Sequence, residues 1–176
     1  VLLFLLFFGC ILFVLYLFRY ANICPAHLST LPNTILWPSE GKVISIINGS
    51  FLRLTGVIIN IESSWKDCYT HVSPICGKIL KIIPTDIKSQ HKGAIYIQIT
   101  NSIYQVDLLI RSTNTIVNEV DYPIIYVKEG DIVYASQPLG ISIFGAHVKL
   151  IIDHQNKLNI SHIYPKQYIY NGEFLV

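Results

Sequence analysis

Residues 126–152, YVKEGDIVYASQPLGISIFGAHVKLII, carry the pattern that decides the fold. Gly130 lies between charged residues and is a turn signal between two apolar runs. The runs 139–144 and 148–152 are rich in β-branched and apolar residues, as half-buried strands are. Gly145 separates them, and a glycine in a strand pattern indicates that the backbone comes close to another segment. The stretch predicts strand, turn, short strand, tight connection and strand.

Short strand signals continue on both sides of this stretch. Residues 94–100 and 104–108 form a natural hairpin across Asn101 and Ser102. Outside the first 18 residues, no stretch keeps a helical apolar period over three turns. Many short strands at a spacing of about 8–12 residues predict a sandwich or a barrel. The further predicted strands are residues 42–47, 56–61, 78–83, 123–127, 157–163 and 167–170.

Three blocks repeat one local theme, a glycine turn that leads into an Ile/Val strand. They are residues 38–43 (PSEGKV), 73–79 (SPICGKI) and 128–133 (KEGDIV). Such turns are typical of the hammerhead connections of barrel-sandwich folds, and the blocks are too short to mark a solenoid. The predicted fold class is mainly β: a single barrel-sandwich-like domain over residues 37–176, preceded by one N-terminal transmembrane helix.

The first 18 residues hold no charged side chain and consist mostly of Leu, Phe, Val and Ile. A stretch of this length can span the hydrocarbon core of a bilayer, which is about 30 Å thick. The alternative is a signal-peptide core, which needs a basic start and a cleavage site of small residues, and the sequence has neither. We therefore expect a single-pass anchor over residues 1–18 and a linker over residues 19–36. Arg19 favours a cytoplasmic position for the main domain.

Composition limits the classes of function. The chain has 176 residues and a net charge of +2, and the absence of a basic stripe argues against a nucleic-acid partner. The roughly 155 residues after the anchor are enough for one domain. Cys24, Cys68 and Cys76 form an odd set that does not match the disulfide framework of a secreted protein. A metal site is conceivable because His71 lies between Cys68 and Cys76, but without a paired CxxC motif we expect idle thiols and no metal.

Five blocks, in order, resemble the short bacterial and archaeal phosphatidylserine decarboxylases and cover nearly the whole chain. The first is Phe18 and Arg19 with the Pro-containing linker, which is similar to the family's stretch after its membrane segment. The others, each with the family pattern after it, are residues 37–43 (WPSEGKV; SPADGKV), 65–79 (ending SPICGKI; SPxxVHxNRSPVDGKI), 95–99 with 126–131 (ending YVKEGD; QIAG…YVKEGDxVxxGExxG) and 143–150 (IFGAHVKL; xFGSRVDVYLP). The tail through residues 171–173 resembles the family's closing GDxVxAGE turn.

The resemblance implies a self-made cofactor and a lipid substrate. In the family, a Ser after the Gly of the FGS motif attacks the preceding carbonyl and forms an ester, and β-elimination then splits the chain and leaves a pyruvoyl group. That group forms a Schiff base with the amine of phosphatidylserine and is the electron sink for loss of CO2, which gives phosphatidylethanolamine. An Asp of the ADG block and a His of the VH block activate the Ser, as an orienting group and a base do.

On this chain, the family's functional positions lack the expected side chains. Ala146 stands at the Ser position after Gly145, and alanine has no oxygen with which to form the ester. Glu40 stands at the Asp position, and Tyr69 at the His position, where a phenol with an ordinary pKa of about 10 is a poor base. His71 lies on the same side of an extended strand as Tyr69 and is the candidate substitute base. We therefore expect an inactive homologue without self-cleavage and without a pyruvoyl cofactor.

Two other functions stay open. A working decarboxylase with a relocated nucleophile would need another Ser, and the candidates are Ser142 and Ser50, neither of which lies in an FGS context. A non-enzymatic adaptor or lipid-binding module would use the same fold without chemistry. His147, in the place of a family Arg, is expected at the surface rather than in a ligand site. The expected partners are membrane phospholipid and either a second copy of the chain or an active paralogue.

Overall fold

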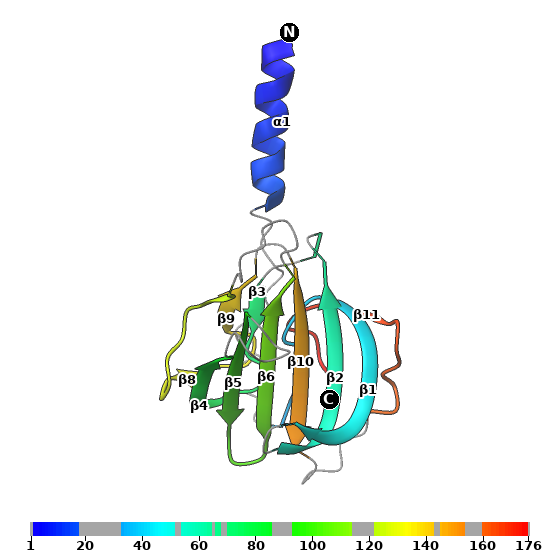
Figure 1. Ribbon diagram of the computed structural model, residues 1–176, viewed down its shortest axis with the longest axis vertical. Helices are drawn as coiled ribbons and strands as arrows, with labels where there is room; N and C mark the ends of the chain where they lie inside the picture. Colours follow the sequence, from blue (N-terminus) through cyan, green and yellow to red (C-terminus); the bar gives the residue numbers. More distant parts are fainter. Residues whose placement is uncertain are drawn as a thin grey trace.

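The computed structural model describes residues 2–17, 33–51, 54–64, 66–67, 70–85, 93–113, 122–142, 145–153 and 160–175. Within these residues the chain forms one helix and eleven strands (Figure 1). Their bounds are α1 (Leu2–Leu17), β1 (Gly41–Phe51), β2 (Leu54–Ser63), β3 (Thr70–Val72), β4 (Gly77–Pro84), β5 (Ala94–Thr100), β6 (Gln105–Ser112), β7 (Ile124–Ile125), β8 (Ile132–Val133), β9 (Pro138–Ile141), β10 (Ala146–Asp153) and β11 (Tyr168–Ile169). The prediction of a mainly β protein is confirmed.

Eight strands form one antiparallel sheet that curls into a half-barrel, in the order β11-β1-β2-β10-β6-β5-β4-β8 (Figure 1). The other three strands form a small antiparallel sheet in the order β3-β9-β7. In the large sheet, β10 lies between β2 and β6 and pairs with both along most of its length. The strand that begins at Ala146 is therefore a central strand.

The predicted hairpin of residues 94–100 and 104–108 is confirmed as β5 and β6. The three residues of β3 are too short to show a period of two, so its bounds are not predicted, although His71 does lie in an extended strand as expected. The predicted strand over residues 157–163 is wrong in its described part, residues 160–163, which form a turn closed by a 3.0 Å hydrogen bond from the Ile163 amide to the Ile160 carbonyl. The exposed Ser161 favours a turn, and residues 157–159 lie outside the described residues.

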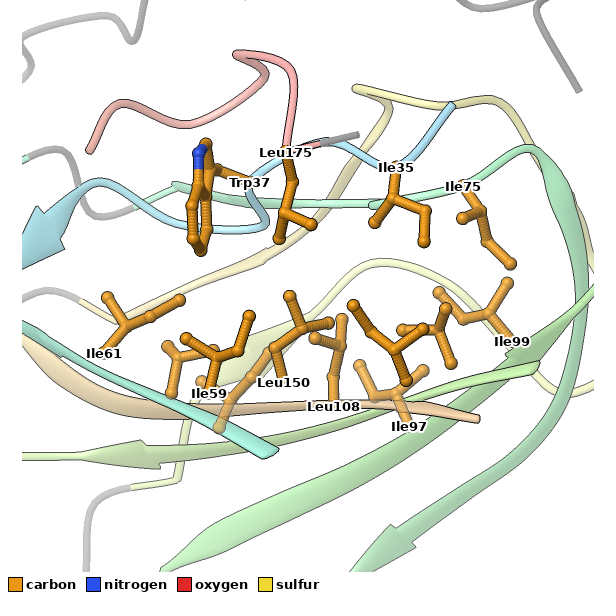
Figure 2. Packing of buried hydrophobic residues seen from close by; sticks show 14 of the residues in the cluster. Ile35, Trp37, Ile59, Ile61, Ile75, Ile97, Ile99, Leu108, Leu150 and Leu175 are labelled. Carbon is orange, nitrogen blue, oxygen red and sulfur yellow. The ribbon is translucent and has the colours of Figure 1, made fainter. Parts of the chain in front are cut away.

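The main hydrophobic core fills the inner side of the half-barrel. Alternate residues of β2, β5, β6 and β10 point into it, as the side-chain period of two requires. Figure 2 shows sheet residues facing a second layer of apolar side chains from segments that cross the open side. The sheet side includes Ile59, Ile61, Ile97, Ile99, Leu108 and Leu150, and the covering layer includes Ile35, Trp37, Ile75 and Leu175. Each such side chain contributes about 1.5–3 kcal/mol on full burial, so this cluster is the main stabilising feature.

The covering layer joins the two ends of the β domain. Leu36 forms a β-bridge with Phe174, and the Leu175 amide donates to the Ile35 carbonyl at 2.7 Å. The Trp37 amide donates to the Glu173 carbonyl at 2.9 Å. Ile35 and Leu36, which lie within the predicted linker, are fully buried, and Ile35 belongs to this layer. Linker residues 19–32 lie outside the described residues.

The glycine-turn blocks take part in a structural repeat. Val43 exchanges two backbone hydrogen bonds with the turn at residues 166–167, and Ile79 exchanges two with the turn at residues 130–131. The first residue of each turn has a positive φ, 76° and 92° respectively. Blocks 38–43 and 73–79 are thus equivalent, and block 128–133 is the partner of the second. The partner of the first block is the turn at residues 166–167, which has Lys166 where the other turn has Gly130. The glycine-turn theme in the sequence therefore does not identify this turn.

α1 is apolar on all sides, and Figure 1 shows it projecting from one end of the β domain. Phe4, Leu5, Leu6 and Phe7 are between 62% and 72% exposed. Within the described part of the chain, no helix is long and apolar enough to cross a membrane.

Gly56→Ala is expected to lower the free energy of unfolding by about 1–3 kcal/mol, as overpacking does. A Cβ at this position would lie 1.9 Å from the Ile152 carbonyl oxygen, so β2 and β10 would have to separate. Gly49, the register partner of Gly56 on β1, provides the matched control, because its nearest neighbour would be the Ile58 Cδ1 atom at 3.5 Å. Urea denaturation compares the two variants, and equal stability for Gly56→Ala and Gly49→Ala would contradict the close approach.

Candidate functional site

Ala146 is the first residue of β10 and is fully buried. Its register partners are Ser63 on β2 and Ser112 on β6. Residues directly opposite each other on antiparallel strands point to the same face, so three small side chains lie in one row across the sheet. The methyl group of Ala146 belongs to the main core together with Val148.

Gly145 holds a backbone conformation that other residues rarely adopt. Its φ is +96°, in the region that glycine populates without steric cost. An added Cβ would lie 2.5 Å from the Ser63 carbonyl oxygen and 2.9 Å from the Thr113 Oγ1 atom. The Gly145 carbonyl accepts a 3.1 Å hydrogen bond from the Thr113 amide. The interpretation of Gly145 as a point of close backbone approach is therefore confirmed.

Glu40 lies beside the same end of the sheet. Its backbone carbonyl accepts a 2.6 Å hydrogen bond from the Ser63 hydroxyl, and Ser63 is the register partner of Ala146. The Glu40 Oε1 atom lies 2.8 Å from the Tyr168 hydroxyl, which also lies 2.6 Å from the Asp67 Oδ1 atom. Burial and these two carboxylates raise the pKa of Tyr168. The structure thus brings Glu40 and Ala146 together through Ser63.

His71 lies on β3, opposite Gly140 of β9, and is 1% exposed. Its Nε2 atom lies 2.9 Å from the Ser142 Oγ atom, and Ser142 is also buried. The Nδ1 atom has no hydrogen-bond partner within the described residues. Burial lowers the pKa of the His71 imidazole to about 4, so the ring is neutral at pH 7.

A neutral imidazole beside a hydroxyl is a nucleophile–base pair in its chemistry. With Nε2 as acceptor, His71 can take the proton of Ser142, and the proton of the imidazole then lies on Nδ1. In a catalytic triad a third group holds that Nδ1–H, and none of the described residues does so here. A buried Nδ1–H without a partner costs about 1–3 kcal/mol. The packing of the rest of the fold must offset this cost to keep the imidazole beside Ser142.

Of the remaining residues singled out from the sequence, Cys76 and His147 are among the described residues. Tyr69 and Cys68 lie outside the described residues. Cys76 is a free, partly buried thiol, and no group of His, Cys, Asp and Glu in the described residues could hold a metal ion. His147 is exposed, as expected, on the opposite face of β10 from Ala146.

The sequence does not reveal the contacts of Glu40. Tyr168 is 128 residues from Glu40 and 101 residues from Asp67 along the chain. Its position follows from the pairing of β1 with β11, where Lys42 faces Tyr168. The signal available in the sequence is the strand predicted over residues 167–170, which does not specify a partner strand.

The fold and this site define a mainly β domain with a buried Ser–His pair and a Gly-Ala junction that follows Ser142 in the sequence. No protein-family model, curated protein or solved structure matches the chain. The resemblance to phosphatidylserine decarboxylases therefore stands on the sequence blocks given above.

Proposed function

We propose that the chain is a membrane-associated, phosphatidylserine decarboxylase-like protein that does not cleave itself after Gly145. The observation that carries this proposal is the side chain at the junction: Ala146 is fully buried and has no hydroxyl. The family's first step moves the acyl group of the glycine onto an oxygen of the next residue. That step has no acceptor here, so no pyruvoyl group forms and the chain lacks the family's electron sink.

The neighbouring hydroxyls do not supply the missing acceptor. Ser63 donates to the Glu40 carbonyl at 2.6 Å, so its hydroxyl is directed to another segment. Ser112 lies across the strand pair from Ala146 rather than next to the Gly145 carbonyl in the chain. The proposal therefore includes a barrel-sandwich-like scaffold that is retained without its chemistry.

Membrane association is assigned to the apolar residues 1–18, with the β domain on the cytoplasmic side. The exposed Phe4, Leu5 and Phe7 of α1 support this assignment, because exposed apolar patches of this kind mark membrane or protein contacts. The partners proposed are phospholipid and either a second copy of the chain or an active paralogue. A purely non-enzymatic lipid-binding or adaptor role agrees with the same observations.

A second candidate function is a decarboxylase with a relocated nucleophile. The Ser142–His71 contact of 2.9 Å favours it, because it places a hydroxyl beside a neutral imidazole that can accept its proton. Here Ser142 Oγ would attack the Ile141 carbonyl carbon and release the Ser142 amine, and elimination of the Ile141 carboxylate followed by loss of ammonia in water would leave a pyruvoyl group. Cleavage between Ile141 and Ser142 distinguishes this candidate from the first.

Incubation with phosphatidylserine vesicles and borohydride tests the proposal. We expect no covalent adduct on the protein and no release of CO2, because a Schiff base needs the pyruvoyl carbonyl. Vesicle flotation in the same experiment is expected to recover the protein with the lipid, and a variant without residues 1–18 is the control. A trapped adduct would contradict the inactive assignment, and a protein that stays out of the lipid fraction would contradict the membrane association.

A further inference from the structure

A hollow of about 490 Å³ lies on the outer face of the eight-stranded sheet, across β2, β10 and β6. Ala146 and Val148 of β10 point into the core, so the alternating His147 and Lys149 point to the opposite face. We call this site the outer-face hollow. The side chains that line it include Asn60, Glu62, Leu109, Arg111, His147 and Lys149.

Strand register places the polar side chains of the outer-face hollow in two rows. His147 lies directly opposite Glu62 on one side and Arg111 on the other. In the next row, Lys149 lies opposite Asn60 and Leu109. Directly opposite residues have Cβ atoms about 4.5–5.5 Å apart, and diagonal neighbours about 7–8 Å. A guanidinium, an ammonium and an imidazole group therefore lie within reach of one small ligand.

The cations of the outer-face hollow have no ion-pair partner in the part of the chain that the structure describes. Within the described residues, the side chains of Arg111 and His147 take part in no ion pair or hydrogen bond, and the Lys149 Nζ atom lies 4.4 Å from the centroid of the Phe51 ring. Burial lowers the pKa of Lys149, which means that its ammonium group has lost part of its hydration. Glu62 is the one acid among the lining residues, so Arg111 and Lys149 outweigh it.

The outer-face hollow also has an apolar side. Leu109 is 4% exposed and packs with Ala94 and Tyr96 in a small cluster against which Phe51 lies. Ligand sites of about 300–1,000 Å³ combine such apolar walls with a few polar groups that fix orientation. The hollow therefore has room for an anionic group together with a short organic part.

We propose that the outer-face hollow binds the phosphate group of an organic phosphate. Arg111 offers a planar fork of donors, Lys149 a point charge and His147 a ring nitrogen, and Arg and Lys are the side chains that proteins use for phosphate oxygens. The apolar wall at Leu109 accommodates the carbon part of the ester. The site lies on the opposite face of β10 from Ala146 and does not depend on the proposed function.

Isothermal titration calorimetry of the full chain in neutral detergent with glycerol phosphate tests the site by measuring the dissociation constant. We expect saturable binding that weakens about tenfold or more for Arg111→Gln and for Lys149→Gln, since each removes a charge-assisted contact. Lys81→Gln on β4 is the matched control: it removes the same charge from an exposed position of the same sheet outside the hollow, and binding should change less than twofold.

A second arm identifies the source of the phosphate. Flotation is compared with vesicles of phosphatidylcholine alone and with vesicles that also contain phosphatidic acid. The difference measures the gain in vesicle-bound protein that is due to the phosphate monoester. A gain that Arg111→Gln abolishes supports a lipid headgroup, and binding of glycerol phosphate without such a gain supports a soluble ester. Equal losses for Lys81→Gln and the two hollow variants, or no binding to either probe by a folded protein, would overturn the proposal. Circular dichroism of each variant establishes that it is folded.

Discussion

Lowering the pH from 7 to 4 is expected to reduce the free energy of unfolding by about 3 kcal/mol through His71 alone. Burial lowers the pKa of the folded His71 to about 4, whereas a histidine in the unfolded chain titrates near pH 6.5. Because the folded pKa is the lower one, the unfolded chain takes up the proton first as the pH falls. The stability tied to the neutral ring is therefore present above about pH 6.5 and is lost as the pH falls through about 4.

Urea denaturation of the parent and of His71→Gln between pH 7 and pH 4 isolates the contribution of His71 to the free energy of unfolding. Glutamine keeps an amide that can reach Ser142 and does not titrate. Asp107 acts with the opposite sign, because burial raises its pKa and the fold favours its protonated form, but it is present in both proteins and cancels in their difference. His147→Gln, which removes an exposed histidine, is the matched control for the substitution itself. The same dependence in the parent and His71→Gln would contradict the assignment.

Ala146→Ser is expected to give no detectable cleavage after Gly145, although it restores the hydroxyl that the ester step needs. The two groups that would activate that hydroxyl already have partners: the His71 Nε2 atom lies 2.9 Å from Ser142 Oγ, and the Glu40 Oε1 atom lies 2.8 Å from the hydroxyl of Tyr168. A nucleophile without a positioned base reacts slowly, because each misplaced group raises the barrier. Mass spectrometry after long incubation measures the result.

Two further variants make this expectation sharper. Combining Ala146→Ser with Glu40→Asp and Tyr69→His restores the family residues at all three positions, and we expect partial cleavage after Gly145. Combining Ala146→Ser with Ser142→Ala releases the His71 Nε2 atom and tests whether His71 is the base. Complete cleavage of Ala146→Ser alone would show that the activating groups are intact, and an uncleaved triple variant would show that the scaffold differs from that of the family.

Much of the fold follows from local pattern. The hairpin of β5 and β6 is predictable because two alternating runs flank a short polar turn at Asn101 and Ser102. The close approach at Gly145 is predictable because glycine in a strand pattern has few other uses. The order of the strands is not predictable in this way: β10 lies between β2 and β6 because of long-range packing, which leaves no mark in a short window.

The candidate site is less accessible to sequence reasoning. His71 and Ser142 are both visible as candidate residues, but their contact joins positions 71 residues apart and depends on the pairing of β3 with β9. Register decides such contacts, since a shift of one residue would move every side chain to the other face. The outer-face hollow is not predictable for the same reason: Arg111 and Lys149 belong to no sequence motif, and only the pairing of β10 with β6 brings Arg111 beside His147 and Lys149 into the next row.

Intact mass spectrometry of the purified, unmodified chain tests the central claim most directly. The absence of an oxygen on the residue after Gly145 predicts a single species at the full mass of 20.0 kDa, with no pyruvoyl terminus. Two fragments would contradict this account. A break between Ile141 and Ser142 would identify the Ser142–His71 pair as the processing site, and a break elsewhere would show that the nucleophile is neither of the residues proposed.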